Sequence, residues 1–367
     1  MNRPSLALFA ALACATLAGA AHADEPVRSW QGNRVIVKDH HLIPVLHDGE
    51  GYGEKYTFKG EFGERGSFYF SLTISNIGLG DHNMESKGRL TIDGQKFTWK
   101  KELDDDEWSS EKGRFHIKAG PADISGTPDR LVMKAGKGSD EVEMVFTPIA
   151  RAWRPRNGQI TWGKDHLISD FTVFPLMKVE GRYKLGGGDW KTIEGRGFGG
   201  RSWSDLAPYG QARWTMEFRG IQGDYTVYFR ELGTTDEYGR QRIPYLLITK
   251  GADILVESFD YTLTPTKVFT DTAHENQYKV PEDFTLVGKD AEEPGKRQFR
   301  GKMTKRKLDG RKDLLKDMNG ALALIAKRYS KPVSYDYDTD YLIEVKVGDQ
   351  VERIEGTGRL EVYHWNK

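Results

Sequence analysis

Apolar and polar residues alternate with a period of two along much of the chain. In "SFYFSLTIS" one face of a strand would carry four apolar side chains: Phe68, Phe70, Leu72 and Ile74. The segment "RLTIDGQKFTW" repeats the pattern on both sides of Asp93-Gly94, a dipeptide that accepts the positive φ angles of a two-residue hairpin turn. Strict alternation is typical of half-buried strands. The pattern therefore predicts antiparallel strands joined by tight turns.

The second half of the chain shows the same alternation. "RWTMEF" places three apolar side chains on one face, those of Trp214, Met216 and Phe218, and "DYTVYFREL" repeats the pattern from Tyr225. Residues 340–365 predict three more short strands. With 41 glycines and one apolar face per strand, the composition and the pattern predict an all-β chain of antiparallel sandwiches or barrels.

One segment departs from this period. Between Gly310 and Pro332, apolar residues recur at helical spacing: Leu315, Met318, Leu322, Ile325 and Tyr329. Proline cannot continue a helix, so the run should end at Pro332. The spacing predicts a single amphipathic helix near the C-terminus, packed on the outside of a sheet.

The first 23 residues have the pattern of a cleaved export signal. A basic start is followed by the apolar run "LALFAALACATLAGAA" and by "AHA", a small-x-small cleavage site. The chain is therefore expected in the periplasm. Its single cysteine, Cys14, lies in this leader, so the mature protein would have no disulfide and would depend on a hydrophobic core.

Length and charge limit the number of domains and the class of partner. The chain has 367 residues, which at about 150 residues per domain suggests two domains. The boundary is expected after Val179, because "FPLMKVEG" reads as a strand leading into a second unit. With 54 basic and 54 acidic residues, nothing favours nucleic acid as a partner.

Sharp enzyme signatures are absent from the sequence. It contains no G-x-S-x-G elbow, H-E-x-x-H helix or C-x-x-C pair. His40, His41, His47 and Asp48 could in principle hold a metal, but adjacent histidines in a strand point to opposite faces, so surface polar residues are the simpler interpretation. We expect neither a metal nor a cofactor.

Four segments together suggest a family. They are "TISNIGLG" (residues 73–80), "FPLMKVEGRY" (174–183), "GRGFGGRSWSDLAPYGQARW" (195–214) and "GTGRLEVY" (356–363). Their order and spacing resemble the survival-factor family of double-calycin proteins, a distant relative of the hydroxyneurosporene synthase and tocopherol cyclase groups. The resemblance runs from about residue 50 to the end. It implies two lipocalin-like barrels packed together, here residues 24–179 and 180–367, and a lipidic ligand such as a ceramide-like sphingolipid precursor or a terpenoid.

A small barrel whose interior is wider than its own side chains leaves an apolar cavity for one lipid chain. The rows Phe68–Ile74 and Trp214–Phe218 are candidate cavity walls, although each is also an adequate plain core. The glycines of "GRGFGG" would let the chain turn sharply or approach another backbone. Three side chains could bind a polar head group at the mouth: Arg201, Trp203 and Arg213. An Arg-Trp stack that merely ties the structure together explains them equally well.

Catalysis is the second hypothesis. In the hydratase relatives the corresponding turn carries an Asp-His pair before the tryptophan, suited to protonating a double bond, whereas this sequence has Gly200 and Arg201 there. Arginine stays protonated near neutral pH and cannot shuttle protons. Asp205, Glu361 or a histidine could substitute, but the sequence favours a lipid carrier without catalytic residues over a cofactor-independent hydratase, isomerase or cyclase. A carrier could also contact membranes or envelope proteins transiently, and a filled, purely structural envelope protein is the third hypothesis.

Overall fold

The computed structural model describes residues 27–76, 80–316 and 330–365. The described residues form two compact units, one within residues 28–207 and the other within residues 208–365, each built on one antiparallel sheet. One sheet is a nearly closed barrel and the other a half-barrel, which confirms the all-β prediction. In these residues no helix is long and apolar enough to cross a membrane. The predicted leader lies outside the described residues.

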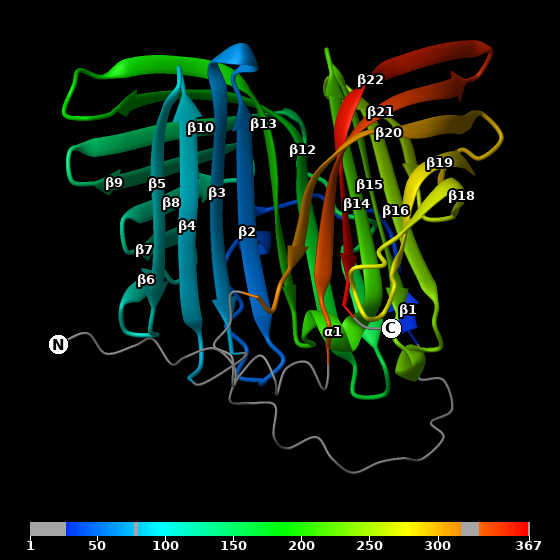
Figure 1. Cartoon of the computed structure of the whole chain (residues 1–367), viewed down its shortest axis with the longest axis horizontal. Coiled ribbons are helices and arrows are strands. Elements are labelled where there is room, and N and C mark those ends of the chain that lie inside the picture. Colours follow the sequence, from blue (N-terminus) through cyan, green and yellow to red (C-terminus); the bar gives the residue numbers. More distant parts are fainter. Residues whose placement is uncertain (1–26, 77–79, 317–329, 366–367) are drawn as a thin grey trace. The chain divides into compact units, whose positions relative to one another are not determined.

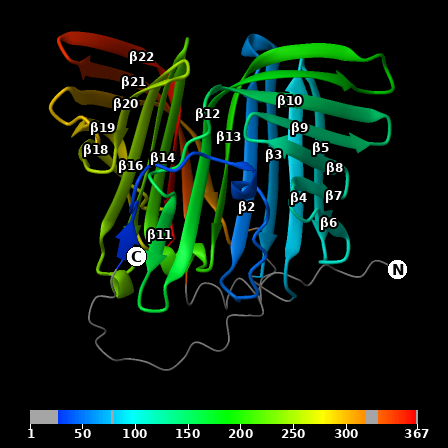
Figure 2. The ribbon, with the colours of Figure 1, turned by 180° about the vertical axis from the view of Figure 1, so that it is seen from behind.

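The first unit contains thirteen strands. They are β1 (Val27–Ser29), β2 (Gly53–Glu61), β3 (Gly66–Ser75), β4 (Asn83–Ile92), β5 (Gln95–Leu103), β6 (Trp108–Ser110), β7 (Phe115–Ala119), β8 (Ala122–Thr127), β9 (Arg130–Lys137), β10 (Asp140–Ala150), β11 (Gln159–Trp162), β12 (Leu167–Lys184) and β13 (Lys191–Ser204). The sheet order is β5-β4-β3-β2-β13-β12-β10-β9-β8-β7-β6; in addition, β11 pairs with β12, and β1 pairs with β11. Strands β6 to β9 run across the strands of the β2 to β5 side of the sheet, behind them in Figure 1 and in front of them in Figure 2. The sheet therefore curls around its core. Two short 3-10 helices, η1 (Asp39–His41) and η2 (Gly63–Arg65), lie in its loops.

The second unit contains nine strands. They are β14 (Ala212–Gln222), β15 (Tyr225–Thr234), β16 (Arg242–Lys250), β17 (Asp253–Ser258), β18 (Tyr261–Thr270), β19 (Lys279–Lys289), β20 (Arg297–Asp313), β21 (Val333–Val347) and β22 (Gln350–His364). The sheet order is β17-β16-β15-β14-β22-β21-β20-β19-β18. A four-residue helix, α1 (Pro208–Gln211), precedes β14, and the 3-10 helix η3 (Asp236–Tyr238) follows β15.

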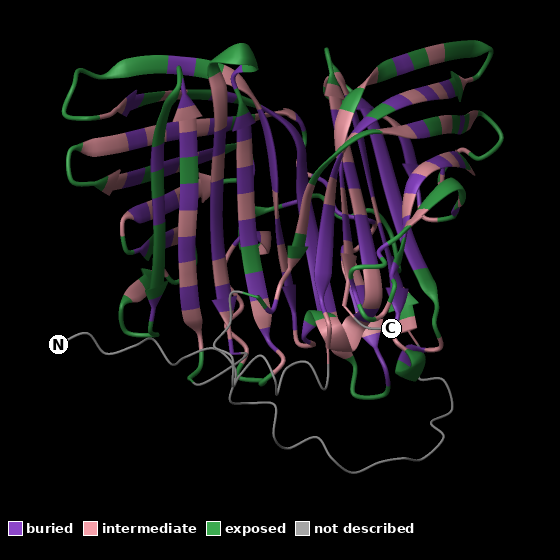
Figure 3. Cartoon of the chain, viewed as in Figure 1, coloured by how far each residue is buried: buried purple, intermediate pink, exposed green. Residues whose placement is uncertain are grey.

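Burial follows the predicted alternation. Strand β4 alternates buried with less buried residues along its length, and Figure 3 shows the same banding on β2. The predicted hairpin joins β4 to β5, where Asp93 and Gly94 have φ angles of 48° and 78°. The predicted strands at Phe68 and Trp214 are β3 and β14. Alternation therefore locates these strands correctly.

Three expectations differ from the structure. Val179 lies inside β12, whose neighbours all belong to the first sheet, and the two units divide between Ala207 and Pro208. The C-terminal segment forms two long strands, β21 and β22, instead of three short ones. The β20 strand extends to Asp313, so the start of the predicted helix is extended chain. Most of that helix falls on residues 317–329, outside the described residues.

Several glycines lie inside strands because a neighbouring aromatic ring packs directly against the backbone there. A Cβ at Gly358 would lie 2.5 Å from the ring of Phe218, so this glycine makes room for a ring inside the sheet. The glycines of "GRGFGG" also lie within a strand, β13, and a Cβ at Gly199 would lie 2.2 Å from the ring of Phe58. These residues serve close packing and not a turn.

Candidate functional site

Polar side chains occupy one end of the interior of the first barrel. Residues directly opposite in an antiparallel pair project to the same face of the sheet. The cross-strand register gives three successive rows on the inner face of β3, β2, β13 and β12: Phe70-Phe58-Gly199-Phe174, Leu72-Tyr56-Arg201-Thr172 and Ile74-Glu54-Trp203-Asp170. The first row is apolar, and the next two carry charged and hydroxyl groups. The polar end of the barrel is therefore built by four neighbouring strands.

Glu54 is the centre of this polar end. Its side chain is fully buried and accepts four hydrogen bonds. Arg201 Nε (2.7 Å) and the hydroxyl of Tyr56 donate to Oε1, while the hydroxyl of Tyr52 (2.6 Å) and the Val45 amide (3.0 Å) donate to Oε2. A buried carboxylate is tolerated when it is paired and hydrogen-bonded in this way. Burial, followed by the charge of Glu54, raises the pKa of both tyrosines, so they remain neutral donors.

Arg201 fastens a loop across the barrel end. Its Nη1 and Nη2 donate to the carbonyls of His41 and Ile43, each at 3.0 Å. The Leu42 carbonyl oxygen lies 2.7 Å from the hydroxyl of Tyr56, whose single proton it shares with Glu54. Asp170 lies 3.8 Å from Nη1 and receives a two-pronged pair of hydrogen bonds from Arg154 at 2.8 and 2.5 Å. Each of the three guanidinium nitrogens of Arg201 thus donates to a group within the protein. Arg201 thereby ties the backbone of residues 41–43 to the sheet.

The next part of the same loop presents a histidine to an aspartate. His47 Nδ1 lies 2.5 Å from Oδ1 of Asp205, the residue that follows β13. The other carboxylate oxygen accepts the Ile168 amide at 2.9 Å, which fixes the carboxylate plane. The side chains of His47 and Asp205 are 42% and 17% exposed, whereas that of Glu54 is not exposed at all. Of the polar side chains at this end, His47 and Asp205 can therefore reach a molecule in solution.

Aromatic rings flank this pair. The ring of Trp203 meets that of His47 edge-on at 5.0 Å, and the ring of Tyr52 lies 6.0 Å away. Gly51 permits the approach of the loop to the chain after β13, because a Cβ there would lie 2.4 Å from the Asp205 carbonyl oxygen. The result is a histidine-carboxylate pair beside apolar ring surfaces.

This arrangement suits proton transfer. A carboxylate that accepts from Nδ1–H leaves Nε2 as the nitrogen that takes or gives a proton. His41 is a poorer candidate, because burial and the neighbouring Arg154 lower its pKa to about 4 and its Nδ1 accepts the Lys38 amide. Within the described residues no group of three His, Cys, Asp or Glu side chains is arranged to hold a metal.

The structure separates the predicted ligand-binding residues into several environments. Arg201 and Trp203 lie at the polar end of the first barrel. Six others are core residues at most 2% exposed: Phe68, Phe70, Leu72, Ile74, Met216 and Phe218. Trp214 is partly buried and packs against the second core, and Arg213 donates to the Thr234 carbonyl at 3.2 Å. Their role in binding a ligand stays a prediction.

The residues that sequence reasoning missed are Glu54, Tyr52 and Tyr56. The signal was present, since "YGEKYTF" places Glu54 at an inward position of an alternating strand between two tyrosines. A charge at such a position needs partners. Of the predicted proton donors, Asp205 is brought to a histidine, whereas Glu361 lies on β22 and accepts from Tyr363 at 3.3 Å.

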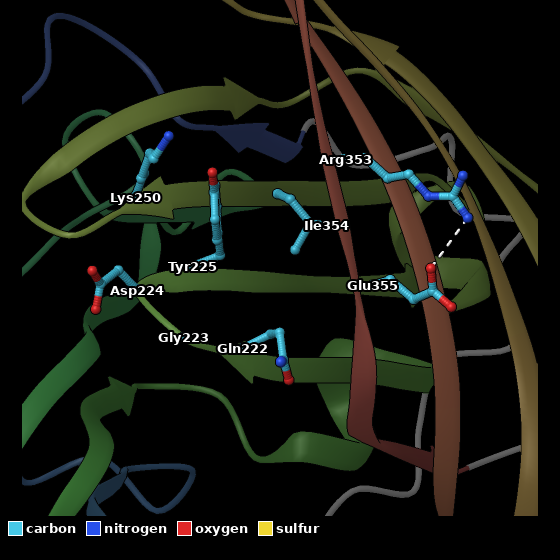
Figure 4. A pocket seen from close by; sticks show the side chains of 8 residues that line it. All are labelled: Gln222, Gly223, Asp224, Tyr225, Lys250, Arg353, Ile354 and Glu355. Carbon is cyan, nitrogen blue, oxygen red and sulfur yellow. Dashed lines mark hydrogen bonds and ion pairs between the residues drawn. The ribbon is translucent and has the colours of Figure 1, made fainter.

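Two surface hollows lie in the second unit. The larger, of about 480 Å³, lies where β14 turns into β15 and is shown in Figure 4. Tyr225 and Lys250 project beside Ile354, and Arg353 pairs with Glu355 at 3.1 Å. The smaller, of about 250 Å³, is lined by Ala273, His274, Glu275, Arg311, Asp313, Leu315, Lys316 and Lys331. Both linings are largely charged or polar, unlike the apolar cavity expected for a lipid chain.

Comparison with known proteins shows the fold. No protein-family model and no curated protein matches the sequence. A crystal structure of CghA with Sch210972 is similar over 94% of this chain and 96% of that chain, with 10% identity and a TM-score of 0.58. Kievitone hydratase from Nectria haematococca is similar over 94% and 98%, with 12% identity and a TM-score of 0.50. A putative AttH from Nitrosomonas europaea matches over 87% and 93%, with 12% identity and a TM-score of 0.50.

These likenesses correct the leaning towards a carrier without catalytic residues. At this level of identity they show the fold alone, and membership of the survival-factor family stays a prediction. The fold is nevertheless shared over nearly its full length with kievitone hydratase, an enzyme by its name. The argument against catalysis rested on the missing Asp-His pair before Trp203. A histidine and an aspartate do meet at this end of the barrel, His47 and Asp205, although they come from separate segments of the chain.

Proposed function

We propose that this protein is a cofactor-independent enzyme that transfers a proton to or from a carbon-carbon double bond of a hydrophobic substrate, as a hydratase, isomerase or cyclase does. The observation that carries the proposal is the partly exposed His47–Asp205 pair, with Nδ1 and Oδ1 2.5 Å apart. The fold shared with kievitone hydratase supports it. The substrate class that we propose is an isoprenoid or sphingoid lipid, met in the periplasm.

Asp205 has an orienting role in this proposal. Its carboxylate accepts Nδ1–H of His47 and stabilises the imidazolium when the ring is charged. Because the Ile168 amide holds the other oxygen, the carboxylate keeps its direction through the cycle. The neutral ring is then a base at Nε2, and the protonated ring is an acid at the same atom.

For a hydration, the imidazolium Nε2–H gives its proton to one alkene carbon. The oxygen of a water molecule bonds to the other carbon, and a proton of that water returns to Nε2. The ring ends in the state in which it began, so no further reactant is needed. Isomerisation and cyclisation use the same first step and end when another carbon loses a proton to Nε2, which restores the imidazolium. The rings of Trp203 and Tyr52, which are 8% and 0% exposed, pack against His47 from the protein side and leave its solvent side for the substrate.

Incubation of the purified protein in D₂O with a panel of isoprenoid and sphingoid alkenes tests this proposal. Carbon-bound deuterium in the recovered lipid, measured by mass spectrometry, reports proton transfer whatever the product. His47→Gln and Asp205→Asn should each reduce the incorporation at least 100-fold. His116→Gln is the matched control, because His116 also contacts carboxylates of the first unit, Glu111 and Asp123, and should keep full activity. Equal activity in His47→Gln and the wild type would refute the assignment.

A further inference from the structure

The backbone just before His47 adopts an unusual conformation. Leu46 has a φ angle of 56°, in the left-handed region that bulky residues seldom occupy. Such a conformation is strained and persists when surrounding contacts enforce it. The Leu46 conformation sets the direction in which the next residue, His47, leaves the loop.

Tyr52 is the side chain that contacts this peptide. Its hydroxyl accepts the Leu46 amide at 3.2 Å and donates to Oε2 of Glu54 at 2.6 Å. One hydroxyl therefore joins the strained peptide to the buried carboxylate. Burial raises the pKa of Tyr52, so the hydroxyl keeps its proton for the bond to Glu54.

The far end of this connection is fixed independently. Glu54 is also held by Arg201, Tyr56 and the Val45 amide, so its position does not depend on Tyr52. On the other side of Leu46, the His47 carbonyl accepts Asn76 Nδ2 at 2.8 Å and lies 3.0 Å from Nε2 of His82. These bonds hold the peptide after His47, whereas the hydroxyl of Tyr52 holds the peptide before Leu46.

We propose that Tyr52 is a positioning residue that keeps Leu46 left-handed and thereby directs the ring of His47 onto Asp205. The proposal deepens the function given above and rests on it. Without the hydroxyl, the Leu46 peptide is free to leave the left-handed region, and the His47 ring no longer stays on the carboxylate. The ring of Tyr52, which packs beside His47, does not supply this restraint.

Tyr52→Phe tests the proposal because it removes the hydroxyl and keeps the ring. The readout is the ring-nitrogen spectrum of the ¹⁵N-histidine-labelled full chain, in which the His47 signals are assigned by their loss in His47→Gln. The wild type should show His47 as the Nδ1–H tautomer, held by Asp205, and Tyr52→Phe should show the tautomer mixture of an unrestrained histidine. In the D₂O assay the same variant should lose deuterium incorporation about 10- to 100-fold.

Tyr183→Phe is the matched control. Tyr183 is another buried tyrosine of the first unit that donates to a carboxylate, that of Asp93 at 3.1 Å. Its loss should leave the His47 signals unchanged. Far-UV circular dichroism of both variants shows whether each has kept the fold.

A second substitution keeps the test informative if Tyr52→Phe is unstable. Glycine adopts the left-handed conformation without strain, so in a Leu46→Gly background the loss of the hydroxyl should change the His47 spectrum less than in the wild type. An unchanged tautomer in Tyr52→Phe, or an equal effect in both backgrounds, would overturn the proposal. The spectra need no substrate, so the absence of deuterium transfer in the wild type would refute the proposed function separately.

Discussion

Arg201 donates through Nε to Oε1 of Glu54 at 2.7 Å, and neither side chain is more than 3% exposed. Both charges come from strands that are far apart in sequence and adjacent in the sheet. Water cannot solvate either charge, so each depends on the other and on the hydrogen bonds around them.

Removal of one member of this pair should therefore be costly. Arg201→Met should lower the free energy of unfolding by about 3–5 kcal/mol, because it leaves Glu54 buried without its cation. The double variant Arg201→Met, Glu54→Gln should lose less than the sum of the single variants. Urea unfolding measures both. Glu180→Gln, which removes an exposed ion pair with Lys178, should change the free energy by less than about 1 kcal/mol.

Acid should destabilise the second unit through His364. Burial lowers the pKa of His364 to about 4, below the value of about 6.5 in the unfolded chain. Between these values the unfolded state binds more protons, so stability is full above pH 6.5 and is lost as the pH falls toward 4. His364→Phe keeps a ring for the stack on Tyr278 and should flatten this part of the pH profile of the unfolding midpoint. An equally steep profile in the variant would contradict this origin.

A methyl group at Gly199 should disturb the first barrel. The added Cβ would lie 2.2 Å from the Phe58 ring and 2.7 Å from the Thr57 carbonyl oxygen, and the backbone atom cannot move aside cheaply. Gly199→Ala should cost about 1–3 kcal/mol in thermal unfolding. At Gly136 the nearest atom is 3.6 Å away, so Gly136→Ala is the control and should unfold like the wild type.

Two tyrosines on the same face of β21 should respond oppositely to loss of the hydroxyl. Tyr335 donates to Asp271 at 2.6 Å, so Tyr335→Phe should destabilise the protein by about 1–3 kcal/mol. Among the described residues the buried hydroxyl of Tyr341 has no hydrogen-bond partner, and burial raises its pKa to about 12. Tyr341→Phe should be neutral or stabilising, since it removes an unsatisfied polar group. Chemical denaturation compares the two, and a large loss in Tyr341→Phe would mean that the hydroxyl has a partner.

The strands could be predicted from the sequence because burial of one face imposes a period of two. Phe68 to Ile74 obey it in β3, and Asp93-Gly94 marks its turn. Glycine positions were less informative. Gly358 leaves space for the ring of Phe218, but the sequence does not distinguish such a glycine from one that forms a turn.

The candidate site was predicted in part. Arg201, Trp203 and Asp205 were selected from one short stretch, but their partners lie about 150 positions away, with 158 positions between His47 and Asp205. Such a pairing depends on the choice of β2 as the neighbour of β13. Local alternation does not specify strand order, so no pattern within either segment could have joined the two halves.

The pairing of β2 with β13 also determines the order of events as the chain is made. Glu54 is synthesised early, whereas Arg201 and Asp205 follow it by 147 and 151 residues. In a nascent chain that ends before β13, the carboxylate of Glu54 has no cationic partner and cannot yet be buried as it is in the folded protein. Assembly of this end of the barrel must therefore wait for the last strand of its sheet, and long-range closure of this kind is slow.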